Sequence, residues 1–142
     1  MPNGFGWIFL NKLNGLNNCF SDGEIAFSSK GVQTRYFELS TFHKLNGGKD
    51  RIHPTEKPVE LYKWIIDNYT KPTDTILDCF GGSMSNAIAC HMKRRKLTII
   101  ELDKDYFDMA LLRFSEYEQK VEDIKEFGYA KTKINAQNPV LF

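Results

Sequence analysis

The sequence predicts an α/β fold organised around one strand–turn–helix–strand segment in the second half of the chain. Three observations support this prediction: a short apolar run that ends at Asp78, adjacent glycines at positions 81 and 82, and a second apolar run, 97–100, that ends at Glu101. Short apolar runs bounded by turn residues are typical of buried strands, and the alanine-rich segment between them favours a helix. This order is that of a βαβ unit with parallel strands.

A βαβ unit with this turn suits a cofactor that contains adenosine. Glycines let the backbone approach a ligand, and the free amides at the start of the following helix face it. The Glu101 carboxylate can accept hydrogen bonds from ribose hydroxyls. A dinucleotide site requires G-x-G-x-x-G, whereas the two glycines here are adjacent and are followed by Ser83 and Met84. S-adenosylmethionine, which has no phosphates, therefore fits better than NAD, although a βαβ unit without any ligand also fits this segment.

Length and composition limit the class of protein. A chain of 142 residues with 42% hydrophobic and 26% charged residues is typical of one soluble globular domain. The net charge of +1 gives no argument for nucleic acid. Three cysteines without paired spacing, Cys19, Cys79 and Cys90, indicate reduced thiols in a cytoplasmic protein without a metal site. No long apolar run or signal peptide is present, so we expect neither membrane insertion nor secretion.

The remaining elements follow from the same patterns. We expect strands over 6–10, 24–28 and 34–39, loops over 11–18 and 40–51, and a helix from Pro58 to about Tyr69. Asp103 is a suitable N-cap for a long helix over about 104–126. Residues 1–127 are expected to form one α/β domain, and 128–142 a polar tail.

Two groups of side chains are interpreted as structural. The long helix has apolar residues at steps of three and four, which predict a core face: Phe107, Ala110, Leu111, Phe114, Tyr117, Val121 and Ile124. The basic run 93–96 enters its strand at the end opposite Glu101. We therefore expect a solvated turn there and not a DNA contact.

Three motifs in a fixed order carry a resemblance to a known family. They are His53-Pro-Thr-Glu-Lys-Pro58, Leu77-Asp-Cys-Phe-Gly-Gly-Ser83 and Ile99-Ile-Glu-Leu-Asp103. Together they resemble the amino-DNA methyltransferases, in the permuted branch whose cofactor half is C-terminal. The resemblance covers roughly residues 5–120. It implies a Rossmann-like S-adenosylmethionine-dependent methyltransferase fold, DNA as partner, and methyl transfer to the exocyclic amine of adenine or cytosine.

The same resemblance implies a cofactor site. Thr55 and Lys57 would line the methionine end, and Asp78 would help to orient it. Glu101 would hold the ribose hydroxyls, and Leu102 would pack against the adenine ring. Residues of the glycine turn would wrap the cofactor: Phe80, Gly81, Gly82 and Ser83. For Thr55 and Lys57, a proline-rich linker that caps the next helix is the alternative.

The sequence departs from the family pattern in ways that bear on activity. Cys79 replaces a proline and Met84 replaces the last glycine of the glycine motif, and Met84 adds bulk where the backbone should approach the ligand. The family's Asp/Asn-Pro-Pro-Tyr/Phe motif accepts the hydrogens of the target amine and stacks on the flipped base. No Pro-Pro pair occurs in this chain. We therefore expect no catalytic residue here, a fold incomplete at its N-terminal side, and association with a catalytic partner chain or a second copy.

Alternatives to the split methyltransferase stay open. One is a non-catalytic S-adenosylmethionine-binding module, either regulatory or a relic. Another is a nicotinamide-binding domain, which the missing third glycine disfavours. At the C-terminus, Gln137-Asn-Pro-Val-Leu-Phe142 resembles the Gln-x-x-x-Leu-Phe peptides that bacterial sliding clamps bind. A tail that packs on its own domain is the alternative there.

Overall fold

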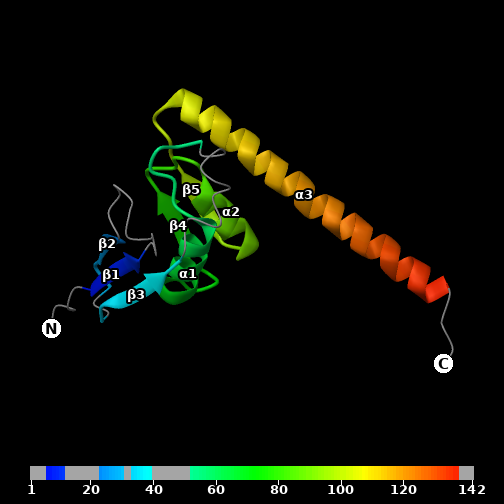
Figure 1. Cartoon of the computed structure of the whole chain (residues 1–142), viewed down its shortest axis with the longest axis horizontal. Coiled ribbons are helices and arrows are strands. Elements are labelled where there is room, and N and C mark those ends of the chain that lie inside the picture. Colours follow the sequence, from blue (N-terminus) through cyan, green and yellow to red (C-terminus); the bar gives the residue numbers. More distant parts are fainter. Residues whose placement is uncertain (1–5, 12–22, 31–32, 40–51, 138–142) are drawn as a thin grey trace, which may run out of the picture. The chain divides into compact units, whose positions relative to one another are not determined.

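The computed structural model describes residues 6–11, 23–30, 33–39 and 52–137, with side chains up to Glu126. The chain divides into two compact units, Met1–Arg51 and Ile52–Phe142. Figure 1 traces the elements of each unit.

The first unit contains a three-stranded sheet in its described residues. Its strands are β1 (Gly6–Asn11), β2 (Gly23–Ser28) and β3 (Arg35–Glu38). The order is β2-β1-β3, with β1 antiparallel to β2 and parallel to β3. Alternation along β1 buries Ile8 and Leu10 and leaves Trp7 half-exposed, as expected for a strand with one covered face. All three predicted strands are confirmed within two residues of their expected ends.

The second unit contains the predicted βαβ segment, which is confirmed. Helix α1 (Val59–Tyr69) is followed by β4 (Thr75–Asp78), α2 (Ser85–Met92), β5 (Lys96–Ile99) and α3 (Lys104–Gln137). Strands β4 and β5 are parallel, with Asp78 opposite Ile99. The core is formed by Ile66 of α1 with Ala89 and Cys90 of α2, and Ile76 and Leu97 of the two strands pack against it. The carboxyl ends of both strands therefore meet at one edge of the pair.

The start of α3 agrees with the sequence, whereas its end and its core face do not. The Asp103 carboxylate accepts hydrogen bonds from the amides of Asp105 (2.9 Å) and Tyr106 (3.1 Å), which confirms the N-cap. The helix continues to Gln137 and not to about 126. Residues 127–137 contain only Gly128 as a helix breaker, which costs about 1 kcal/mol and does not stop a helix.

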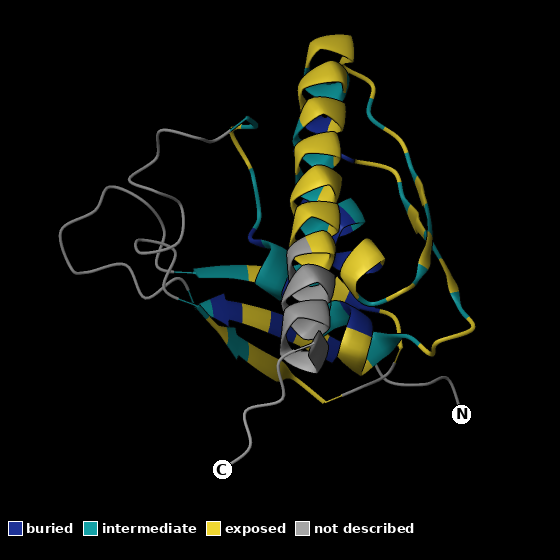
Figure 2. Cartoon of the chain, turned by 90° about the vertical axis from the view of Figure 1, so that its right-hand side faces the viewer, coloured by how far each residue is buried: buried dark blue, intermediate teal, exposed yellow. Residues whose placement is uncertain are grey.

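The predicted core face of α3 is too wide. Ala110 is fully buried, but Leu111 is 46% and Ile124 71% exposed. Figure 2 shows that exposed residues dominate α3 along most of its described length. Only a narrow stripe of this helix contacts the rest of its unit, so apolar periodicity alone overestimates burial.

The predictions for the C-terminal segment lie mostly outside the described residues. Gln137 is the last residue of α3, and the rest of the clamp-like peptide lies outside the described residues, so clamp binding and the division at 127 stay predictions.

Cys79 is exposed and Cys90 is buried, both as free thiols, and burial raises the pKa of Cys90 to about 11. Cys19 lies outside the described residues. Within them, no helix could cross a membrane and no cluster of three metal-binding side chains occurs.

Candidate functional site

The glycine turn lies beside the residues that follow β5. The amide of Ile100 donates to the carbonyl of Asp78 (2.9 Å), and the amide of Gly81 donates to the carbonyl of Ile100 (2.7 Å). A Cβ on Gly81 would lie 3.1 Å from the Ile99 side chain and 3.2 Å from the Ile100 oxygen. Glycine at position 81 therefore permits the close approach that brings the turn against Glu101.

The Glu101 carboxylate is held in place by two backbone amides. Gly82 donates to its Oε2 (2.6 Å) and Asp103 to its Oε1 (3.0 Å). These bonds, that of Asp103 foremost, lower the pKa of Glu101 below its ordinary value. Since each carboxylate oxygen can accept a second hydrogen bond, an ionised, oriented carboxylate retains capacity for a ligand diol.

Two apolar side chains near this carboxylate are almost fully solvent-accessible. Leu102 follows Glu101 directly and is 98% exposed, and Phe80 of the glycine turn is 88% exposed. Large apolar residues with such exposure at a strand edge are candidates for ligand contact. A charged acceptor flanked by apolar surface suits a ligand that combines a diol with a flat ring.

The turn itself requires left-handed backbone conformations. Gly82 has φ +51°, which glycine adopts without strain. Met84, the N-cap of α2, has φ 55° and is a non-glycine residue in the left-handed region. Its side chain is only 3% exposed. The bulk of Met84 therefore lies in the interior of the fold, and its effect on cofactor binding stays a prediction.

Asp78 is oriented by groups from the turn and from α2. Its Oδ1 accepts from the amide of Phe80 (3.0 Å), and its Oδ2 accepts from the side-chain amide of Asn86 (2.8 Å). Asn86 in turn accepts from the thiol of Cys90 (3.4 Å). Sequence reasoning missed Asn86, although its position in the first turn after the glycines places it within reach of the strand end.

The segment before α1 contacts the glycine turn through His53. A Cβ on Gly82 would lie 3.5 Å from the His53 ring, and that ring packs edge-on against Tyr106 at 4.5 Å. Thr55, which is exposed, has its hydroxyl 3.1 Å from His53 Nδ1. Lys57 lies partly buried just before α1. The structure thus brings His53, Gly82 and Glu101 together and adds His53 to the candidate site.

An ion pair beside the glycine turn is a second contact that the sequence does not predict. Arg113 of α3 approaches Glu56 (3.2 Å) and donates to the carbonyl of Ser83 (2.9 Å) and to the hydroxyl of Ser85 (3.0 Å). The position of Glu56 within the His-Pro-Thr-Glu-Lys-Pro motif indicates that it lies near the candidate site. No sequence pattern indicates the same for Arg113, because its partners come together only in the folded chain.

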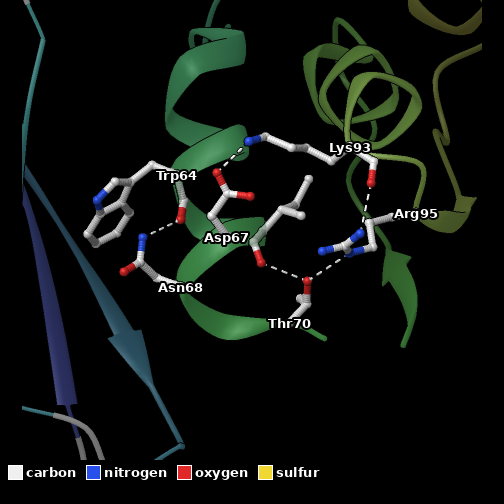
Figure 3. Close-up of polar contacts among 7 residues, drawn as sticks. Trp64, Asp67, Asn68, Thr70, Lys93 and Arg95 are labelled. Atoms are coloured by element: carbon white, nitrogen blue, oxygen red, sulfur yellow. Dashed lines mark hydrogen bonds and ion pairs between the residues drawn. The ribbon is translucent and has the colours of Figure 1, made fainter. Parts of the chain in front are cut away.

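The opposite ends of β4 and β5 show a different arrangement (Figure 3). Lys93 pairs with Asp67, and Arg95 donates to the Lys93 carbonyl (2.8 Å) and to the Thr70 hydroxyl (3.4 Å). Thr70 donates to the carbonyl of Ile66 (2.7 Å) at the end of α1. The segment forms a turn, as expected, and Arg94 and Lys96 are exposed, whereas the partly exposed side chains of Lys93 and Arg95 join this turn to α1.

The sequence matches a family model described as DNA methylase, of the N6/N4 class, over residues 12–112. Among curated proteins of Escherichia coli, the chain is 40% identical to the putative methylase YubD over 57 residues, or 40% of this chain and 25% of that one. It is 39% identical to the DNA adenine methyltransferase YhdJ over 61 residues, or 43% of this chain and 21% of that one.

Solved structures of similar proteins agree in fold. The M1.HpyAVI–SAM complex is 28% identical with a TM-score of 0.58, and the match covers 78% of this chain and 63% of that one. The cytosine-N4-specific PvuII DNA methyltransferase is 18% identical with a TM-score of 0.52, covering 80% and 51%. The predicted α/β methyltransferase-like fold is confirmed. The matches span about a quarter or less of the two curated relatives.

Proposed function

Since this chain belongs to the N6/N4 DNA methylase family, we propose that it binds S-adenosylmethionine at the carboxyl edge of β4 and β5. Glu101 carries the proposal. Its carboxylate is ionised and fixed by the amides of Gly82 and Asp103, and the glycine turn and the residue after Glu101 expose the apolar side chains of Phe80 and Leu102. The structural relative described as a SAM complex supports the choice of cofactor.

We assign each part of the cofactor to a group of the candidate site. The ribose hydroxyls would donate to the free acceptor sites of Glu101, and the adenine ring would pack on Leu102. The glycine turn would wrap the cofactor. Asp78, Thr55 and Lys57 would receive the charged amino-acid end. When bound, S-adenosylmethionine supplies an electrophilic methyl group.

The reaction we propose for this site is methyl transfer to the exocyclic amine of adenine or cytosine in DNA. The isolated chain should not catalyse it, because the sequence contains no Asp/Asn-Pro-Pro-Tyr/Phe motif. The proposal therefore requires a catalytic segment from a separate chain or from a longer form of this protein. A non-catalytic S-adenosylmethionine-binding module is the second candidate, and the same absence favours it.

Calorimetric titration tests cofactor binding. The chain should bind S-adenosylmethionine, and Glu101→Gln should weaken binding roughly tenfold or more, because two charge-assisted bonds to the ribose are lost. Asp108→Asn removes an exposed carboxylate of α3 that pairs with Lys104, and serves as the matched control. Equal affinity of the Glu101→Gln and Asp108→Asn proteins would contradict the ribose assignment. Binding of NADH in place of S-adenosylmethionine would reject the cofactor.

A methyl-transfer assay tests the catalytic part. Purified chain, labelled S-adenosylmethionine and unmethylated DNA should give no incorporation above background. Incorporation by protein free of host methylase would show that catalytic residues lie within this chain. If an adjacent gene encodes an Asp-Pro-Pro-Tyr segment, co-expression of both products should restore transfer. Continued inactivity of that pair would favour the non-catalytic module.

A further inference from the structure

Arg113 joins three segments of the second unit that are far apart in sequence. From α3 it reaches Glu56 in the segment before α1, and it reaches Ser83 and Ser85 at the start of α2. The Glu56 side chain is 4% exposed and that of Arg113 28%. A carboxylate this buried is stable only when it is paired, so the contact is a fixed part of the fold.

Glu56 also closes the small loop that carries His53 and Thr55. Its second oxygen accepts from the amide of Ile52 (3.3 Å), and its own amide donates to the carbonyl of His53 (3.1 Å). The side chain of Glu56 therefore fixes the loop 52–56 internally and attaches it to Arg113. Any movement of this loop relative to the glycine turn must break one of these bonds.

The two segments that Arg113 connects are assigned to different ends of the cofactor. The loop 52–56 contains Thr55 and directly precedes Lys57, the two residues of this segment proposed for the amino-acid end. Ser83 belongs to the glycine turn, whose Gly82 amide orients Glu101 at the ribose end. The guanidinium group of Arg113 thus bonds to both segments, in addition to the packing of the His53 ring against Gly82.

We propose that Glu56 and Arg113 are positioning residues that hold the amino-acid end of the cofactor site in register with the ribose end. The inference rests on the proposed function and adds to it a pair of residues that need not touch the ligand. It predicts a selective defect: loss of the pair should affect ligands that span both ends, and spare ligands that occupy only the ribose and adenine part.

Binding of S-adenosylhomocysteine, compared with binding of 5′-methylthioadenosine, tests this selectivity. Arg113→Met should weaken S-adenosylhomocysteine roughly tenfold and 5′-methylthioadenosine by about twofold or less, since only the former has the amino-acid group. Arg113→Lys should recover part of the affinity, because lysine restores the charge without the planar fork that reaches three acceptors. Lys125→Met, which breaks the exposed Lys125–Glu122 pair on the same helix, is the control and should change neither affinity.

The outcomes separate the inference from the proposed function. If Arg113→Met weakens both ligands equally, or weakens neither, the positioning role is overturned. The proposal that the unmodified chain binds S-adenosylmethionine is not affected by either result. Failure of the unmodified chain to bind either ligand would overturn both. If Arg113→Met does not fold, as judged by circular dichroism, Glu56→Gln provides the same comparison while retaining an acceptor oxygen for the arginine. Equal weakening or no weakening in that variant would likewise overturn the role.

Discussion

The two edges of the β4–β5 pair use polar groups in opposite ways. At the amino edge, Lys93 and Arg95 bond to side chains and carbonyls of α1 and of their own turn. At the carboxyl edge, the Glu101 carboxylate is oriented by backbone amides. The residues flanking it, Phe80 and Leu102, are exposed by 88% and 98%. At the first edge Lys93 and Arg95 are bonded within the fold, whereas the second edge presents an oriented charge and apolar surface to solvent.

This difference bears on the role of the basic run 93–96. The segment 93–96 is the densest cluster of positive charge in the described unit and invites assignment to DNA. Its Lys93 and Arg95 instead connect the end of α1 to the start of β5 (Figure 3). The less conspicuous edge, with one glutamate and two exposed apolar residues, has the properties of a ligand site. Substitutions at the amino ends of the two strands should therefore change stability, and substitutions at their carboxyl ends should change ligand binding.

The largest effect should come from the core that supports both edges. Ile66 is 2% exposed and packs with Ala89 and Cys90. Ile66→Ala should lower the free energy of unfolding by about 2–5 kcal/mol, because it removes buried methyl groups and leaves a cavity. Denaturant unfolding measures this change. Ile124→Ala, at a 71% exposed position, is the control and should change stability by less than about 0.5 kcal/mol. Similar losses in both variants would mean that this core is misplaced.

A binding defect without a stability defect is expected at the carboxyl edge. Leu102→Ala should weaken S-adenosylmethionine roughly tenfold, because part of the apolar contact with adenine is lost. The midpoint of unfolding should not move, since this side chain is 98% exposed. Leu112→Ala, at a 62% exposed leucine of α3, is the matched control for calorimetry. Unchanged affinity in Leu102→Ala would remove this residue from the proposed site.

The parts of the structure that the sequence predicts are those determined by local chemistry. The strand–turn–helix–strand order follows from apolar runs and glycines, and the N-cap at Asp103 follows from residue type. Contacts between distant segments, such as Arg113 with Glu56 and Ser83, have no periodicity and were missed. The predicted end of α3 at about 126 is wrong, because neither Gly128 nor the polar composition of the following residues stops a helix. The Met84 conformation could not be predicted, since a methionine gives no signal of positive φ.

A smaller, purely structural effect is expected at the amino edge. Thr70→Val removes a hydroxyl that donates to the Ile66 carbonyl and accepts from Arg95. The free energy of unfolding should fall by about 1 kcal/mol, the usual net value of a hydrogen bond. Affinity for S-adenosylmethionine should stay unchanged. Thermal unfolding and calorimetry measure the two quantities, with Thr73→Val, at an exposed position of the same connection, as the control. Loss of affinity in Thr70→Val would mean that the two edges are coupled.

The last expectation concerns pH, and near neutrality the expected effect is zero. The bonds from Asp103 and Gly82 lower the pKa of Glu101 below its ordinary value of 4.5. A carboxylate whose pKa is lower in the folded than in the unfolded state stabilises the fold above the unfolded value. This stabilisation is lost as the pH falls through the folded value.

The stability difference between the unmodified chain and Glu101→Gln should therefore be constant from pH 7 down to about 5 and should shrink only in more acidic solution. Carbon NMR of the Glu101 carboxyl group measures the titration directly, and unfolding at each pH measures its consequence. A Glu101 titration midpoint at or above the ordinary value of 4.5 would show that the two amides do not hold the carboxylate in solution, and the oriented acceptor proposed for the ribose would be lost with them.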